Sequence, residues 1–160
     1  MELTEARKQA VQASWALVRA NLKQNAVDFF ICFFKRNPGY QAMFKDLRDL
    51  SAAELPTHPK MRSHGVRVFY AISSLVDSLD DLDVVVTITK KTANDHFPRG
   101  IRESHFENLF GTILFFLEER LGAAFDQVTN EGWQAVAAVL MSVIKAELTE
   151  QLAGQTATNL

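Results

Sequence analysis

Two histidines in this chain lie on the apolar faces of predicted helices and are suited to metal chemistry. His64 and His96 belong to different helical stretches, and Phe44 precedes both, after the break at Asn37-Pro38. An imidazole can ligate a transition metal or donate a hydrogen bond, and porphyrin iron is commonly held by one. We therefore expect these histidines to face one apolar site that could hold a metal.

Taken alone, each histidine has a simpler explanation. His96 closes a predicted helix, where a protonated imidazole would be stabilised by the helix dipole. A lone histidine on an apolar face, such as His64, is usually a core residue whose polar atoms are satisfied. A second histidine facing it across the domain favours the shared site for His64, whereas for His96 the helix-capping explanation stays open at this point.

The composition bounds the class of protein. The chain has 160 residues, 48% of them hydrophobic, with 12 phenylalanines against 2 tryptophans and 2 tyrosines. This length suits one domain with a sizeable core. A formal net charge of −2 provides no basic surface for nucleic acid, and the apolar runs are too short to span a bilayer. We therefore expect neither a nucleic acid nor a membrane as a partner.

The expected location is the cytoplasm. Residues 1–5 lead into a charged amphipathic helix, whereas a secretory signal would need an apolar run there. The single cysteine, Cys32, excludes an internal disulfide and suits a reducing compartment.

Helical periodicity dominates the chain and predicts an all-α fold of six to eight helices in one domain, residues 1–160. The first helix is expected to start after a cap at Thr4 and to end at a bend at 21–25, and the second to run from that bend to 37–39. Four more helices are expected at about 58–79, 82–96 and 104–121, and from about 129 onward. A short helical turn is expected at 38–44 and a possible one-turn helix at 51–54. Residues 154–160 are small and polar and are expected to fray.

Two of these helices carry the histidines on an inward stripe. In the 58–79 helix the stripe consists of Met61, His64, Gly65, Val68, Ala71, Ile72, Leu75 and Leu79. In the 82–96 helix it consists of Leu82, Val85, Val86, Thr89, Thr92, Ala93 and His96, followed by the stop signal Phe97-Pro98-Arg99-Gly100.

Several segments resemble the globin family. The string Ser63-His64-Gly65-Val66-Arg67-Val68 is similar to the distal segment of globins, and His96-Phe97-Pro98-Arg99-Gly100-Ile101 is similar to their proximal segment. Residue types that animal globins commonly carry also occur in matching places, at Trp15, Pro38, Phe44 and Trp133. The resemblance covers essentially the whole chain and favours an intracellular globin of an invertebrate.

This resemblance implies a haem b cofactor (iron protoporphyrin IX) with His96 as the proximal iron ligand. The other ring nitrogen of His96 is expected to donate to the carbonyl of Thr92, one turn back. His64 is expected on the distal side, donating a hydrogen bond to bound dioxygen. Val68 and Phe30 would wall the ligand pocket, and Phe30 crowds it without adding a donor where many globins carry leucine.

Further cofactor contacts are implied at the edges of the site. Phe44 is expected to stack on the porphyrin. Arg67 and Arg99 are candidate partners of the haem propionates, because guanidinium matches carboxylate well. Each could instead be an ordinary surface arginine, and Arg67 could swing inward to the ligand. Apolar cofactor contacts are expected from Ile101, Phe106 and Leu109.

Other residues are expected to have structural roles. Gly65, opposite Ala26, would let two helices cross closely because neither side chain is bulky. His58 and His105 lie at predicted helix starts and are expected at the surface.

The predicted function is reversible binding of dioxygen for storage or transport. One alternative is a haem enzyme, redox protein or sensor of the same fold, such as a nitric oxide dioxygenase or nitrite reductase, with His64 able to bind the iron. Another is a haem-free helical sensor or interaction module. Val84 and Ile88 lie outside the inward stripe and hint at a homo-oligomeric contact beside the haem.

Overall fold

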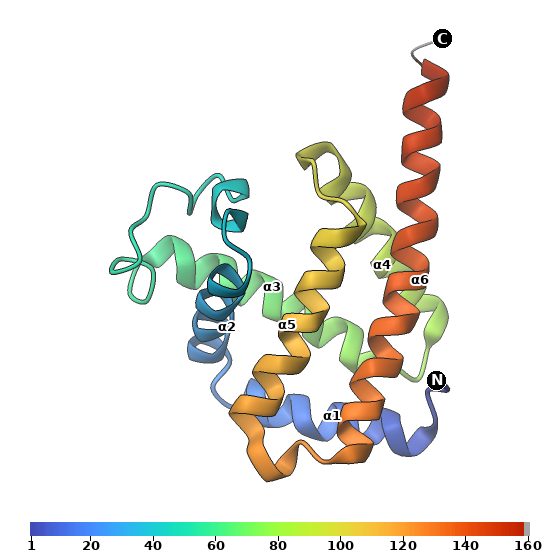
Figure 1. The fold of residues 1–160 in the computed structure, drawn as a ribbon. Coiled ribbons are helices and arrows are strands. Elements are labelled where there is room, and N and C mark those ends of the chain that lie inside the picture. Colours follow the sequence, from blue (N-terminus) through green and yellow to red (C-terminus); the bar gives the residue numbers. More distant parts are fainter. Residues whose placement is uncertain (159–160) are drawn as a thin grey trace.

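Six α-helices and three short 3-10 helices make up the described part of the chain, residues 1–158 of a computed structural model. In chain order these are α1 (Glu5–Arg19), α2 (Leu22–Arg36), η1 (Tyr40–Met43), α3 (Pro59–Asp77), α4 (Leu82–His96), η2 (Phe97–Arg99), α5 (Glu103–Leu121), η3 (Gly122–Ala124) and α6 (Gln127–Thr158) (Figure 1). Residues 1–158 contain no strand, which confirms the all-α prediction. None of the helices within this range is both long and apolar enough to cross a membrane.

The bounds of α4 follow from its flanking residues. Asp81 caps the start of the helix, its carboxylate accepting a hydrogen bond from the Val84 backbone N–H at 3.3 Å. At the other end, Pro98 and Gly100 stop the helix, and Gly100 adopts a φ of +82° that glycine tolerates best. His96 is therefore held as the last residue of α4, next to the turn that leads into α5.

The crossing of α2 and α3 depends on two small residues. A Cβ placed on Gly65 would lie 3.0 Å from the Cβ of Ala26 and 3.3 Å from its carbonyl carbon. Both residues are buried, as the sequence predicted from their size. The close approach brings α3 against α2, so that His64 on α3 and Phe30 on α2 come within reach of each other.

A second close crossing joins α1 to α6. A Cβ on Gly132 would lie only 2.7 Å from the carbonyl oxygen of Arg7, so any larger residue there would push the two helices apart. The two tryptophans lie between the helices nearby, with ring centroids 5.7 Å apart. Trp133 donates to the hydroxyl of Ser14, and Trp15 donates to the hydroxyl of Ser73 on α3, each at 2.9 Å.

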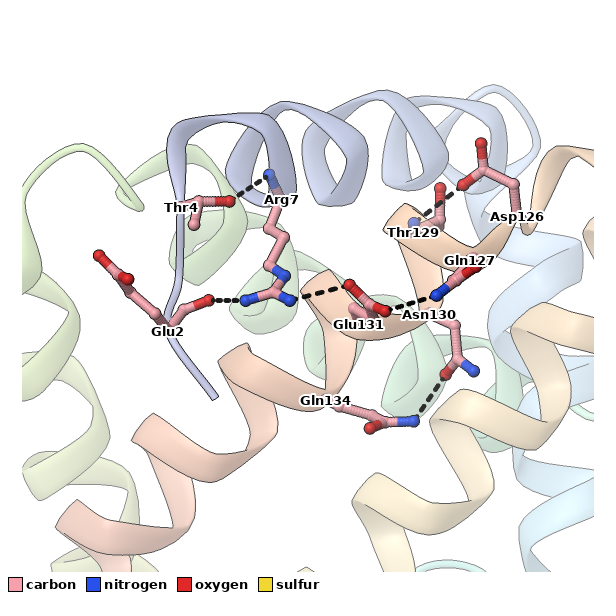
Figure 2. A network of polar contacts seen from close by, with 9 residues as sticks. All are labelled: Glu2, Thr4, Arg7, Asp126, Gln127, Thr129, Asn130, Glu131 and Gln134. Carbon is pink, nitrogen blue, oxygen red and sulfur yellow. Dashed lines mark hydrogen bonds and ion pairs between the residues drawn. The ribbon is translucent and has the colours of Figure 1, made fainter.

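Polar contacts continue this joint at the surface (Figure 2). The guanidinium of Arg7 on α1 lies between the backbone carbonyl of Glu2 and the carboxylate of Glu131 on α6, which it contacts at 2.8 Å. Gln127 donates to the other oxygen of Glu131 at 2.9 Å. The network joins the N-terminal segment to the start of α6. Its residues lie far along the chain from His64 and His96.

Helix α3 has two inward faces instead of the single predicted stripe. The buried face, which packs toward α1 and α2, consists of Met61, Gly65, Phe69, Ser73 and Val76. The other face carries His64, Val68 and Ala71, which line a cavity. The predicted stripe mixed the two faces and omitted Phe69, Ser73 and Val76, because α3 contacts its neighbours over more than one side.

The two short helices predicted between residues 38 and 54 differ from the structure. The short helix begins at Tyr40 instead of Pro38. The one-turn helix expected at 51–54 is a series of turns: Ser51 and Glu54 exchange hydrogen bonds as a helix start would, but Pro56 prevents the helix from continuing.

Residues 154–158 belong to the tail that the sequence predicted to fray, and in the structure they are helical. They prolong α6, which extends past the other helices (Figure 1). Once a helix exists, each added residue gains a hydrogen bond at small entropic cost, and here the hydroxyl of Thr158 donates to the Gly154 carbonyl. Residues 159–160, the rest of the predicted tail, lie outside the described residues.

Candidate functional site

A cavity of about 710 Å³ lies among α2, η1, α3, the end of α4 and α5. Its volume is that of a site for a sizeable organic ligand. The predicted site residues that line it are Phe30, Phe44, His64, Arg67, Val68, His96, Arg99, Ile101, Phe106 and Leu109. These residues come from every part of the chain between α2 and α5, and the fold brings them to one place.

His96 is held in a defined orientation at the cavity wall. Its Nδ1 atom lies 2.7 Å from the carbonyl oxygen of Thr92. A carbonyl can only accept, so Nδ1 carries the proton and Nε2 keeps its lone pair. The edge of the Phe106 ring also contacts the imidazole, at 5.7 Å between centroids. The arrangement gives the cavity one oriented imidazole that can ligate a metal.

Thr92 contributes through its backbone. Its side chain is outside the cavity, and its hydroxyl donates to the carbonyl of Ile88 at 2.9 Å. The predicted contact of Thr92 with the site is therefore the carbonyl that orients His96. Hydrogen bonds of this kind fix the ring of a metal-binding histidine and increase its basicity.

His64 lies between two phenylalanine rings. Phe30 and Phe44 each meet the imidazole edge to face, with centroid distances of 4.8 Å and 5.0 Å. Its Nε2 atom is buried and makes no hydrogen bond to any described residue. Leaving such a group without a partner costs about 1–3 kcal/mol, so an unpaired buried nitrogen on a cavity wall indicates that a ligand completes its hydrogen bonding.

The same surroundings keep His64 uncharged. Burial lowers the pKa of its imidazole to about 4, because the charged ring loses solvation, and the nearby Arg67 guanidinium acts in the same direction. The ring is thus neutral near pH 7 and carries a single N–H. It can offer either a donor or a lone pair to a small molecule in the cavity.

The rim of the cavity is positively charged. Lys45, Arg67 and Arg99 are exposed at its edge, against one carboxylate, that of Asp46. Within residues 1–158, the side chains of Arg67 and Arg99 form no ion pair or hydrogen bond with another residue. The apolar interior with a cationic edge suits a flat hydrophobic molecule that carries carboxylates at one side.

Several lining residues were missed by the sequence reasoning. They are Phe33, Tyr40, Met43, Lys45, Asp46, Leu47, Ala71 and His105. Ala71 could have been predicted, because it lies on the inward stripe that helical periodicity assigned to the 58–79 helix. His105 was expected at the surface, and that prediction is wrong: the residue is half-buried and lines the cavity next to Phe106.

Comparison with known proteins identifies the class. Residues 27–144 match the family model described as Globin. The chain is 31% identical to a globin of Nerita albicilla over 145 residues, covering 91% of this chain and 92% of the relative. It is 31% identical to Hemoglobin-3 of Phacoides pectinatus over 151 residues, covering 94% and 97%, and 34% identical to a globin of Buccinum undatum over 148 residues, covering 90% and 98%. The chain therefore belongs to the globin family.

Globins are haem proteins, and the cavity can be tested for its fit to that group. The lone pair left on His96 Nε2 is of the kind that binds iron, and the unpartnered His64 Nε2 is a polar atom on the wall of the same cavity. The walls are mostly aromatic and aliphatic, and the rim carries cations for the propionates. The residues present fit a haem.

Proposed function

We propose that this globin binds dioxygen reversibly, for storage or transport, with haem b in the cavity and residues 1–160 as a single globin domain. The observation that carries the proposal is the neutral His64, whose buried and unpartnered Nε2 lies on the wall of the cavity that His96 also lines. When bound, ferrous haem supplies the iron at which a diatomic gas binds reversibly.

His96 acts as the proximal ligand in this proposal. Its Nε2 lone pair would hold the haem iron, and the hydrogen bond from Nδ1 to the Thr92 carbonyl keeps the ring from rotating away. Phe106 supports the imidazole from the α5 side. No other histidine in the described chain closes a cavity-lining helix in this way.

His64 stabilises dioxygen by donating its single N–H. With haem present, dioxygen would accept this hydrogen bond better than carbon monoxide, because the iron would give dioxygen partial negative charge. A hydrogen bond of this kind contributes about 0.5–1.5 kcal/mol net, and more toward a charged acceptor. Phe30 and Phe44 keep the imidazole in the cavity by packing against it.

The remaining lining residues exclude water and hold the cofactor. Val68 and Phe30 would wall the gas side of the haem, while Ile101, Phe106 and Leu109 would give it apolar contacts from the other lining segments. A dry pocket slows the loss of the ferrous state, because protons and water promote oxidation. At the rim, Arg67 and Arg99 bind the propionates.

We also propose a cytoplasmic location, which the single cysteine in the sequence supports because it needs no oxidising compartment. Val84 on α4 is exposed and Ile88 is half-buried. A homo-oligomeric contact at these residues stays a prediction, and sedimentation of the purified protein would test it.

The visible spectrum of the purified protein tests the proposed function. The expected result is a Soret band, either present on purification or gained when haemin is added, and a ferrous form that binds and releases dioxygen over repeated cycles. A single broad visible band in the unliganded ferrous form indicates an open gas site. Protein that gains no Soret band with haemin, or that is oxidised at once by dioxygen, contradicts the proposal.

A further inference from the structure

His105 places a third imidazole on the cavity wall. The Arg102 backbone N–H donates to its Nδ1 at 2.9 Å, across the first turn of α5. Because Nδ1 accepts a hydrogen bond, the neutral ring must carry its proton on Nε2. The capping contact thus leaves His105 with one N–H donor, and the residue that bears it lines the site.

The ring of His105 is also held by an aromatic neighbour. It packs on Tyr40 of η1 with centroids 5.1 Å apart, and the Tyr40 hydroxyl accepts a hydrogen bond from Asn108 at 2.7 Å. Tyr40 in turn contacts Phe33 edge to face at 5.5 Å. These contacts join η1 to α5 along one edge of the cavity. A donor held in this way loses little freedom when it binds a ligand.

The two arginines between α4 and α5 have different roles: Arg102 stabilises the turn, and Arg99 lines the cavity. Arg102 donates to the carbonyls of Phe97 and Ile101 at 2.8 Å, and its guanidinium lies 3.9 Å from the centre of the Phe97 ring. These contacts hold the Arg102 side chain against the turn between α4 and α5. Arg99 in the same turn lines the cavity and has no such contacts within the described residues. His105 and Arg99 are therefore the donors that this turn and the start of α5 offer to a ligand.

We propose that His105 is a further haem-binding residue, whose Nε2–H donates to a propionate carboxylate. The inference rests on the proposed function, since it requires haem in the cavity. The surrounding wall, formed by Phe33, Phe106 and Leu109, is apolar. The carboxylates are the parts of haem that can accept a strong hydrogen bond at such an edge.

The experiment compares two cofactors in the same variants. The protein is loaded with haem or with haem dimethyl ester, which lacks the carboxylates, and the rate of cofactor loss to an excess of apoglobin acceptor is measured. His105→Phe keeps a ring against Tyr40 but removes the donor. We expect it to hasten haem loss roughly threefold to tenfold, the loss of one hydrogen bond, and to leave the loss of the ester unchanged.

A second variant and a control separate the donor from the cap. His105→Glu can still accept from the Arg102 N–H as helix-capping glutamates do, but repels a carboxylate. It should lose haem faster than the parent and retain the ester equally well, even if His105→Phe folds poorly. The control is His58→Phe, because His58 Nδ1 likewise accepts from a backbone N–H, that of Lys60, but the residue does not line the cavity. Its rates should equal those of the parent.

The possible results are distinct. Haem loss at the parental rate in both His105 variants overturns the inference and leaves the proposed function intact. Equal acceleration with haem and with its ester also overturns it, because the residue would then act through packing. A parent that takes up neither cofactor overturns the proposed function and this inference together.

Discussion

The ring of Phe30 meets the imidazole of His64 edge to face, with 4.8 Å between centroids. Phe44 contacts the same imidazole at 5.0 Å, and the two phenylalanines touch each other at 6.0 Å. The three rings form a closed cluster in which the only polar atoms are those of His64. This packing couples the position of the His64 imidazole to the size of the residue at position 30.

Replacing Phe30 with leucine should speed the binding of carbon monoxide. The smaller side chain withdraws one wall from the gas side, and relief of about 1 kcal/mol of steric barrier corresponds to roughly a fivefold increase in association rate. Flash photolysis of the carbon monoxide form measures this rate. Phe29→Leu is the matched control, because Phe29 is adjacent and buried but does not line the cavity. An unchanged or slower rate in Phe30→Leu would show that the ring does not obstruct the ligand.

Replacing His64 with leucine should weaken dioxygen binding selectively. Loss of the donor should raise the dioxygen dissociation rate about tenfold, as expected for a hydrogen bond worth about 1.4 kcal/mol, and should also raise the rate of autoxidation. Carbon monoxide affinity should stay equal or increase. Stopped-flow ligand replacement gives both rates. If the unliganded ferrous parent shows the split visible bands of two axial histidines, and His64→Leu abolishes them, His64 is an iron ligand and the open gas site is disproved.

Replacing His96 with alanine should abolish stable haem binding unless imidazole is supplied. The Thr92 carbonyl would lose its contact with the imidazole, and the cavity would lose its oriented lone pair. The Soret band during gel filtration, with and without imidazole in the buffer, measures retention. A variant that keeps the parental spectrum without imidazole would disprove the assignment of the proximal ligand.

Arg67 and Arg99 should each make a modest contribution to haem retention. Both are exposed at the rim, and an exposed ion pair is worth only about 0–1 kcal/mol. Each change to glutamine should therefore raise the rate of haem loss by less than about fivefold, with a larger effect in the double variant. Transfer of haem to an apoglobin acceptor measures these rates. Identical rates in the parent, both single variants and the double variant would refute the role in propionate binding.

Two glycine substitutions should have opposite effects on stability. Gly132→Ala places a Cβ 2.7 Å from the backbone carbonyl of Arg7, so α1 must move, at a cost of about 1–3 kcal/mol. Gly111→Ala in α5 meets nothing within 4 Å and should stabilise the protein by about 0.5–1 kcal/mol through its better helix propensity. Denaturant unfolding of the haem-loaded protein compares them. Equal stabilities would contradict the tight α1–α6 crossing.

Much of the local structure could be predicted because its causes lie close together in the chain. The α4 helix has its predicted bounds, since Asp81 caps it and the stop signal after His96 ends it. The small residues Gly65 and Ala26 predicted a close helix crossing. The positions of His64 and His96 on cavity-facing helices followed from their spacing and from the resemblance of the surrounding segments to globins.

Other features were decided only when the helices came together. The sequence by itself determined which residues share a side of each helix, because the α-helical repeat is a local property. Which side meets a neighbour and which meets the cavity depends on packing: α3 turns Phe69 and Ser73 to the core and His64 to the cavity. His105 reaches the cavity for the same reason, because the α4–α5 turn and the contact with Tyr40 set the orientation of α5. Such contacts join residues that are far apart in the chain, so local sequence patterns do not predict them.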